Sequence, residues 1–184
     1  LQLYASGVMI MDKCKDLVPD YFSFVKGVVD SDDLSLNISR EILQQDPKLK
    51  TIANSIEKKI KKELLDMLEN DKDNYIKFFK TFGNSIKYGI YSSYGMKKEF
   101  LQDLLLFDSS KEDTMITLKD YVDNMKEGQD KIYYATGESV DKINMLPQVD
   151  KFKEKDIEVL YLTDNIDEFV LQMMMNYDNK SFIN

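Results

Sequence analysis

The segment LNISREILQQ, residues 36–45, contains Arg40, the only arginine among 25 basic residues. Asn37 or Ser39 is expected to cap a helix here, which would place Arg40 in the first helical turn. A cation at this end opposes the helix dipole by a few tenths of a kcal/mol up to roughly 1 kcal/mol. A forked guanidinium beside free N–H groups is nevertheless a good partner for a phosphate oxygen. Gln44 lies one turn later on the same face, so the two side chains predict an anion site.

A second interpretation of the same residues needs no ligand. Glu41 follows Arg40 directly and offers it a local ion pair on the protein surface. The residues alone leave the anion site and the surface ion pair both open.

Composition and spacing disfavour most other reactive sites. The chain has no histidine, which excludes Ser-His-Asp and Cys-His nucleophile systems and most zinc sites. The glycines occur singly, and residues 137–139 (GES) lack the spacing and the lysine of a phosphate loop. Lysines on either side of Cys14 would lower its pKa, but we favour an unreactive thiol. Acidic clusters such as residues 30–33 are interpreted as solvated loops and the methionine run 173–175 as helix core, so no metal site is predicted.

Charge and hydropathy limit the class of protein. The 184 residues carry a net charge of −8 with a pI near 4.7, so no general attraction to nucleic acid or to anionic lipid is expected. No apolar run approaches the roughly 20 residues needed to cross a bilayer. The single cysteine fits a reducing compartment, and we predict a cytoplasmic protein. A start at Leu1, without an initiator methionine, suggests a fragment of a longer chain.

The apolar pattern predicts the elements that must position these residues. Residues 1–11 are expected to form one or two strands interrupted near Gly7, and a buried strand is expected over Val25–Val29. Three amphipathic helices are predicted next, because apolar residues recur every three or four positions. The first begins near Pro47, the second contains Tyr75 to Ile90 and the third contains Phe100 to Leu105.

The last third is predicted to alternate strands and helices. After a short helix at Leu118–Met125, residues Lys131–Thr136 and Ile157–Leu162 are strands by composition. Ser139 is expected to cap a helix between these strands, and another helix follows over residues 166–174. Strand, helix, strand, helix with short connections indicates a parallel βαβ unit.

Three long segments carry a family resemblance. They are VKGVVDSDDLSLNISREILQQD (residues 25–46), DYVDNMKEGQDKIYYATGES (residues 120–139) and EVLYLTDNIDEF (residues 158–169). Together they resemble the middle domain of the heat-shock protein 90 chaperones, and the bacterial form in particular. The resemblance covers essentially the whole chain, which is identified as a middle-domain fragment of that family.

The resemblance completes the predicted architecture. The fold class is α/β, with three-layer αβα pieces, namely the end of a larger one and a smaller C-terminal βαβ unit, joined by a bundle of amphipathic helices. Residues 1–46 would be the C-terminal part of the larger αβ subdomain, residues 47–128 a helical coil region and residues 129–184 the smaller αβ subdomain.

The resemblance also implies a function in an ATP-dependent chaperone that assists protein folding in the heat-shock response. In the family, the arginine of the SRE motif contacts the γ-phosphate of ATP held by the N-terminal domain, and a glutamine one turn later supports that contact. By motif these are Arg40 and Gln44. ATP and Mg²⁺ would be bound mainly outside this chain, so neither a cofactor nor ATPase activity is expected for the fragment alone.

Partners follow from the same resemblance. They are the N-terminal nucleotide-binding domain of the same chain, client proteins, the 70-kDa heat-shock chaperone system and a second copy joined through a C-terminal domain. Nucleic acid and membranes are not expected partners. The alternative function is a protein-binding scaffold module that makes no catalytic contribution.

Overall fold

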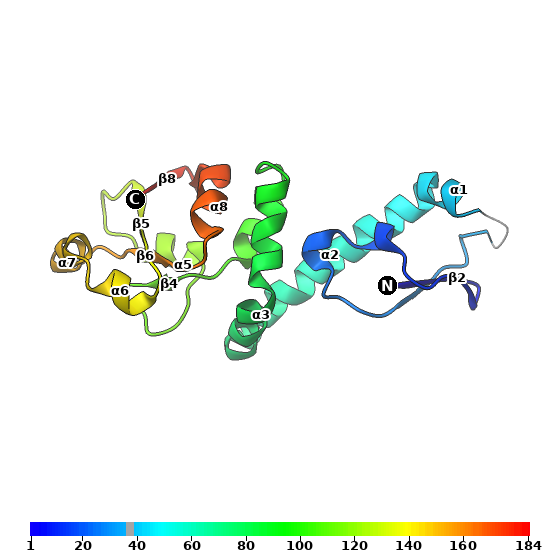
Figure 1. The fold of residues 1–184 in the computed structure, drawn as a ribbon, viewed down its shortest axis with the longest axis horizontal. Helices are drawn as coiled ribbons and strands as arrows, with labels where there is room; N and C mark the ends of the chain where they lie inside the picture. Colours follow the sequence, from blue (N-terminus) through cyan, green and yellow to red (C-terminus); the bar gives the residue numbers. More distant parts are fainter. Residues whose placement is uncertain (36–38) are drawn as a thin grey trace. The chain divides into compact units, whose positions relative to one another are not determined.

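A computed structural model describes residues 1–35 and 39–184. The chain divides into two compact units, Leu1–Asp66 and Met67–Asn184, which are described separately (Figure 1). The mixture of helices with parallel and antiparallel strands confirms the predicted α/β class.

The first unit opens with a β-hairpin. Strands β1 (Gln2–Ala5) and β2 (Val8–Met11) pair antiparallel, and Ser6 and Gly7 between them both have positive φ, 47° and 78°. Two consecutive positive φ values give the turn the twist that a two-residue hairpin needs, and glycine adopts such a φ without strain. Two strands interrupted near Gly7 were expected, and this prediction is confirmed.

The predicted buried strand at Val25–Val29 is wrong in both its bounds and its burial. The observed strand β3 (Val28–Asp30) pairs in parallel with β1 at the edge of the three-stranded sheet β2-β1-β3. Val28 is 63% exposed. An apolar run predicts a strand covered on both faces, but the apolar sequence carries no information about whether a strand lies at a sheet edge.

Two short 3-10 helices, η1 (Lys15–Leu17) and η2 (Asp20–Phe22), connect β2 to β3. Helix α1 (Arg40–Gln45) and the long helix α2 (Pro47–Asn70) follow, and α2 begins at Pro47 as predicted. The core of this unit joins the sheet to the two helices; its buried members are Leu3, Ala5, Met11, Cys14, Leu17, Leu34, Leu43 and Leu49.

The second unit begins with helices. Helix α3 (Lys72–Ser92) is capped by the Asp71 side chain, which accepts a hydrogen bond from the Asn74 amide. The predicted third helix is shorter than expected: α4 (Lys98–Leu101) gives way to the 3-10 helix η3 (Gln102–Leu104). The buried Tyr75 hydroxyl donates to the carbonyl of Leu104 at 2.6 Å, which fixes this turn against α3.

A five-stranded sheet, ordered β4-β6-β5-β8-β7, forms the centre of the second unit. After η3, the chain of this unit forms, in order, β4 (Asp108–Ser109), α5 (Leu118–Asp123), β5 (Lys131–Thr136), α6 (Val140–Asn144), α7 (Pro147–Glu154), β6 (Leu160–Leu162), α8 (Asp167–Met174), β7 (Asn176–Tyr177) and β8 (Lys180–Ile183). Strands β5 and β6 are parallel and are connected by α6 and α7, which confirms the predicted βαβ unit. Strand β6 is shorter than the predicted span Ile157–Leu162, and the sequence did not predict α7, β4, β7 or β8.

Helices cover the two faces of this sheet. Figure 1 shows α6 and α7 on one side of β5 and β6, and α5 and α8 on the other. Ile143 and Val149 of the first pair pack with Val159 and Tyr161. From the opposite face, the Tyr134 hydroxyl donates to Glu168 of α8 at 3.4 Å. Among the described residues, no helix combines the length and apolar character needed to span a bilayer.

Candidate functional site

The start of α1 positions the two residues that the sequence singled out. Ser39 has extended backbone angles (φ −68°, ψ 154°), and its side chain accepts a hydrogen bond from the Ile42 amide at 3.4 Å. This confirms Ser39 as the cap and makes Arg40 the first residue of α1. The alternative cap, Asn37, and the side chain of Arg40 lie outside what the structure describes.

The burial of Leu43 sets the outward face of α1. Leu43 is fully buried in the core of the first unit, whereas Gln44 beside it is exposed. Ile42 is also 62% exposed. The backbone of α1 therefore places Gln44 one turn after Arg40, on the same side of the helix, and the side chain of Gln44 is exposed.

The thiol of Cys14 lies in the core of the same unit. Burial raises its pKa, and Cys14 is only 1% exposed. This direction is opposite to the one that neighbouring lysines would cause, and it agrees with our preference for an unreactive thiol. In the part of the chain that the structure describes, no three His, Cys, Asp or Glu side chains are grouped to hold a metal ion.

An exposed group of rings on the second unit was not predicted. Tyr88 and Tyr91 of α3 and Phe169 of α8, here called the aromatic patch, are 52%, 41% and 52% exposed. Their ring centroids are 6.1 Å apart for Tyr88 and Tyr91, and 6.0 Å apart for Tyr91 and Phe169. These separations are typical of interacting rings. The three rings thus form a cluster of exposed aromatic surface that spans α3 and α8.

Further exposed apolar side chains lie on the turn that follows α3 and at the end of α8. Tyr94 and Met96 of this turn are 83% and 82% exposed, and Met175 at the end of α8 is 69% exposed. The turn packs against α8 through Gly95, whose φ is +79° and where an added Cβ would lie 2.5 Å from the Met173 carbonyl oxygen. Only glycine fits this close approach without strain. The interpretation of the methionine run as helix core is correct only for Met174, which is fully buried, because Met173 is half-buried and Met175 is exposed.

A sequence signal for the patch existed in the helical spacing. In α8 the buried residues are Asp167, Val170, Leu171 and Met174, which define one face and leave Phe169 on another. In α3, Ile86 and Ile90 are buried, whereas Tyr88 and Tyr91 point elsewhere. The sequence signal is an aromatic residue placed outside the buried apolar face of its helix, and it occurs in both α3 and α8.

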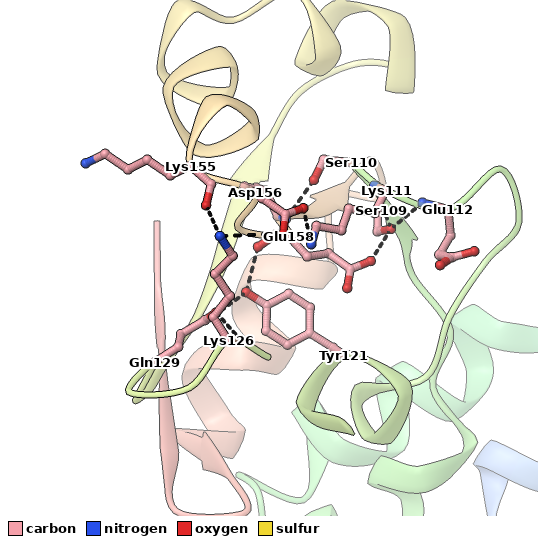
Figure 2. Close-up of polar contacts among 11 residues, drawn as sticks. Ser109, Ser110, Lys111, Glu112, Tyr121, Lys126, Gln129, Lys155, Asp156 and Glu158 are labelled. Atoms are coloured by element: carbon pink, nitrogen blue, oxygen red, sulfur yellow. Dashed lines mark hydrogen bonds and ion pairs between the residues drawn. The ribbon is translucent and has the colours of Figure 1, made fainter. Parts of the chain in front are cut away.

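A buried carboxyl group forms a third notable feature. Glu158 is 4% exposed, and its Oε1 accepts a hydrogen bond from the Ser109 hydroxyl at 2.6 Å. Its Oε2 is buried without a hydrogen-bond partner among the described residues. Figure 2 shows Ser109 and Tyr121 directed toward Glu158 from different segments, and the Tyr121 hydroxyl donates to the Glu158 carbonyl at 2.7 Å.

Two ion pairs near Glu158 are made to Asp156 and not to the Glu158 carboxyl group. Lys111 lies 2.8 Å and Lys126 3.5 Å from the carboxylate of Asp156, at the exposed edge of the cluster. Burial raises the pKa of Glu158, the Ser109 hydrogen bond and Lys111 oppose the rise, and Glu112 and Asp120 add to it. The cluster thus joins the loop after β4, helix α5 and the segment before β6 around an acid that is costly to ionise.

Comparison with known proteins decides the family of this fold. The family model described as "Hsp90 protein" matches residues 1–184. The chain belongs to the Hsp90 family. The resemblance that the sequence segments carry is therefore confirmed.

The Hsp90 relatives that resemble this chain are bacterial. It is 59% identical to a chaperone protein HtpG from Clostridium acetobutylicum over 99% of this chain and 29% of that protein. It is also 59% identical to a chaperone protein HtpG from Oceanobacillus iheyensis, over 99% of this chain and 29% of that protein. A chaperone protein HtpG from Clostridium botulinum is 58% identical. The chain thus spans 29% of the length of these curated relatives.

The buried acid of this Hsp90 segment gives a pH-dependent stability prediction. Because the folded state raises the pKa of Glu158 above its ordinary value of 4.5, the folded state binds the proton more tightly than the unfolded state. The stability contributed by the protonated form is present below pH 4.5 and is lost as the pH rises through the folded pKa. Glu158→Gln, which cannot ionise, is therefore expected to raise the free energy of unfolding at pH 8 by on the order of 1 kcal/mol.

Urea unfolding of both proteins between pH 4 and pH 8 measures this difference. The difference in the free energy of unfolding between Glu158→Gln and the wild type should be small at pH 4 and increase with pH. Glu127→Gln, at an exposed carboxyl group, should show no increase with pH. A constant difference across the range would mean that Glu158 titrates normally in the folded state.

Proposed function

We propose that this Hsp90 segment is the middle part of an ATP-dependent molecular chaperone. It binds client proteins, assists their folding and supplies Arg40 to the γ-phosphate of ATP held by the N-terminal domain. The observation that carries the proposal is the family match over the whole chain together with the Ser39-capped helix that begins at Arg40.

Arg40 has the chemistry for this step. A guanidinium stabilises the charge that develops on a transferring phosphoryl group, and its donor geometry matches phosphate oxygens. Gln44, one turn later and exposed, supports the contact with a neutral amide. Since ATP and Mg²⁺ would be held mainly by another domain, the arginine acts only when the domains close, and domain closure therefore gates hydrolysis.

The aromatic patch supports client binding. Three rings from two helices present apolar surface to solvent, and an unfolded polypeptide offers apolar side chains that a folded protein hides. Aromatic residues dominate the binding energy of protein interfaces because they bury large areas with few rotatable bonds. We therefore infer that Tyr88, Tyr91 and Phe169 contact client segments.

The remaining parts of the proposal rest on the family alone. They are the division into residues 1–46, 47–128 and 129–184, the 70-kDa heat-shock system as a partner, the homodimer formed through a C-terminal domain and the cytoplasmic location. Each remains a prediction for the full-length protein.

Reconstitution from two pieces tests the catalytic role. The 184-residue chain is added to the isolated nucleotide-binding domain of an HtpG relative, and phosphate release from ATP is measured. We expect the chain alone to release no phosphate and the mixture to release it several-fold faster than the nucleotide-binding domain alone. The Arg40→Ala chain should bind the domain without increasing the rate.

The alternative is a scaffold module that binds proteins without contributing to catalysis. The aromatic patch supports the scaffold function as much as the catalytic one, because the patch does not involve Arg40. If the mixture hydrolyses ATP no faster than the nucleotide-binding domain while the chain still binds unfolded polypeptides, the scaffold function is correct and the arginine proposal is wrong.

A further inference from the structure

A lysine is buried between the two helices that carry the aromatic patch. Lys87 of α3 is 3% exposed. Its Nζ lies 2.7 Å from the Asp164 carboxylate and 2.6 Å from the Asp167 carboxylate. Asp164 belongs to the loop after β6, and Asp167, also nearly fully buried, is the first residue of α8. One ammonium group therefore ties α3 to both the loop and the helix.

Hydrogen bonds join Asp164 and Asp167 in one turn. The Asp164 amide donates to the Asp167 carboxylate at 3.1 Å, and the Asp167 amide donates to the Asp164 carbonyl at 3.0 Å. The other oxygen of the Asp167 carboxylate faces Lys87. A shift of this turn and α8 along α3 would therefore break both ion pairs to Lys87 at once.

Aromatic faces complete the surroundings of the ammonium group. Lys87 Nζ lies 5.4 Å from the ring centroid of Phe79 and 5.8 Å from that of Phe107. These distances are within the range of cation–π attraction. Carboxylates and rings thus hold the charge from several sides.

The buried ion pairs add little to the free energy of unfolding. Burial raises the pKa of the Asp167 carboxyl group, while Lys87 opposes the rise. Removing such charges from water offsets much of their attraction, so a buried ion pair adds little stability over apolar residues of similar size. Separating the pair is costly, however, because a displaced helix would leave a buried charge unpaired.

The fixed helices are those that present the patch. Tyr91 lies one helical turn after Lys87, and Phe169 lies two residues after Asp167. The Tyr91 and Phe169 rings, 6.0 Å apart, come from the two sides of the ion pair. The relative placement of these rings is therefore coupled to the contact between Lys87 and Asp167.

We propose that Lys87 is a positioning residue for polypeptide binding: its pairs with Asp164 and Asp167 hold α8 on α3 so that Tyr88, Tyr91 and Phe169 form one preorganised surface for apolar segments of unfolded chains. This proposal rests on the proposed client-binding function. A preorganised surface binds more tightly because its side chains lose less freedom on binding.

A charge-neutral double variant tests the role. Lys87→Met with Asp167→Asn removes both buried charges, and only the half-exposed carboxylate of Asp164 loses its lysine partner. Lys119→Met with Asp123→Asn makes the same change at an exposed pair on α5 and serves as the matched control. Affinity for a reduced, alkylated polypeptide is measured by fluorescence anisotropy on the 184-residue chain, together with Tm and amide hydrogen exchange.

We expect the Lys87 double variant to bind about fivefold to tenfold more weakly with a Tm within a few degrees of the wild type. Amides of α8 should exchange faster than in the wild type, while those of α7 should not change. The control pair should leave both affinity and exchange unchanged. Unaltered affinity in a folded Lys87 double variant would overturn the proposal.

Two further variants keep the outcomes separate. If the double variant does not fold, Asp164→Asn replaces it in the test, because Asp164 is 46% exposed and its loss removes only one of the two ion pairs. Asp164→Asn should weaken polypeptide binding about twofold. Unchanged binding would overturn the positioning role. If Phe169→Ser does not weaken binding, the client-binding patch itself is wrong. If Phe169→Ser weakens binding but the Lys87 variants do not, only the positioning role is wrong.

Discussion

Arg40→Ala in the full-length protein is expected to lower the rate of ATP hydrolysis by at least about 100-fold, because arginine fingers contribute about 10³–10⁵ to phosphoryl-transfer rates. The effect should appear in kcat rather than in the affinity for ATP, since the proposed contact with the γ-phosphate would form only after the domains close. Steady-state phosphate release across a range of ATP concentrations separates the two parameters. Gln44→Ala, which removes a neutral supporting amide, should reduce kcat by a smaller factor.

Lys50→Ala is the matched control for this experiment. Lys50 is an exposed cation near the start of α2, so its removal changes the net charge equally without removing the proposed finger. A kcat within about twofold of wild type in the Arg40 variant would contradict the catalytic role, because a finger is worth orders of magnitude. Equal losses in both variants would point to a general effect of charge.

The helix that begins at Arg40 was predictable because its signals are local. A serine cap accepts a hydrogen bond from an amide three residues along the chain, so this signal depends only on residues within one helical turn. The same reason explains the correct start of α2 at Pro47 and the cap of α6 by Ser139. The roles of Arg40 and Gln44, by contrast, depend on a nucleotide held elsewhere and remain predictions.

Lys87 shows what local patterns could not predict. A lysine within an amphipathic helix is normally solvated, and the burial of this one depends on carboxylates 77 residues or more away in sequence. Glu158 is similar, because its partner Ser109 lies 49 residues away. In both cases the polar side chain is buried by contacts that only the folded sheet brings together, and no spacing rule in the sequence encodes them.

The aromatic patch yields the second prediction of large effect. Tyr91→Ser with Phe169→Ser is expected to weaken binding of a reduced, alkylated polypeptide by at least about 30-fold, since a single aromatic hot spot is worth about 2 kcal/mol or more and every 1.4 kcal/mol is tenfold. Both side chains are 41% or more exposed, so their truncation should leave Tm nearly unchanged. Anisotropy titrations and thermal unfolding of the 184-residue chain measure the two quantities.

Met145→Ser separates the patch from general surface hydrophobicity. Met145 follows α6 and is 78% exposed, so its loss removes apolar surface from the same unit without touching the patch. If this control weakened binding as much as the double variant, clients would be held by scattered apolar contacts. If neither change weakened binding, client recognition would belong to parts of the full-length chaperone outside this chain, and the middle segment would act through Arg40 alone.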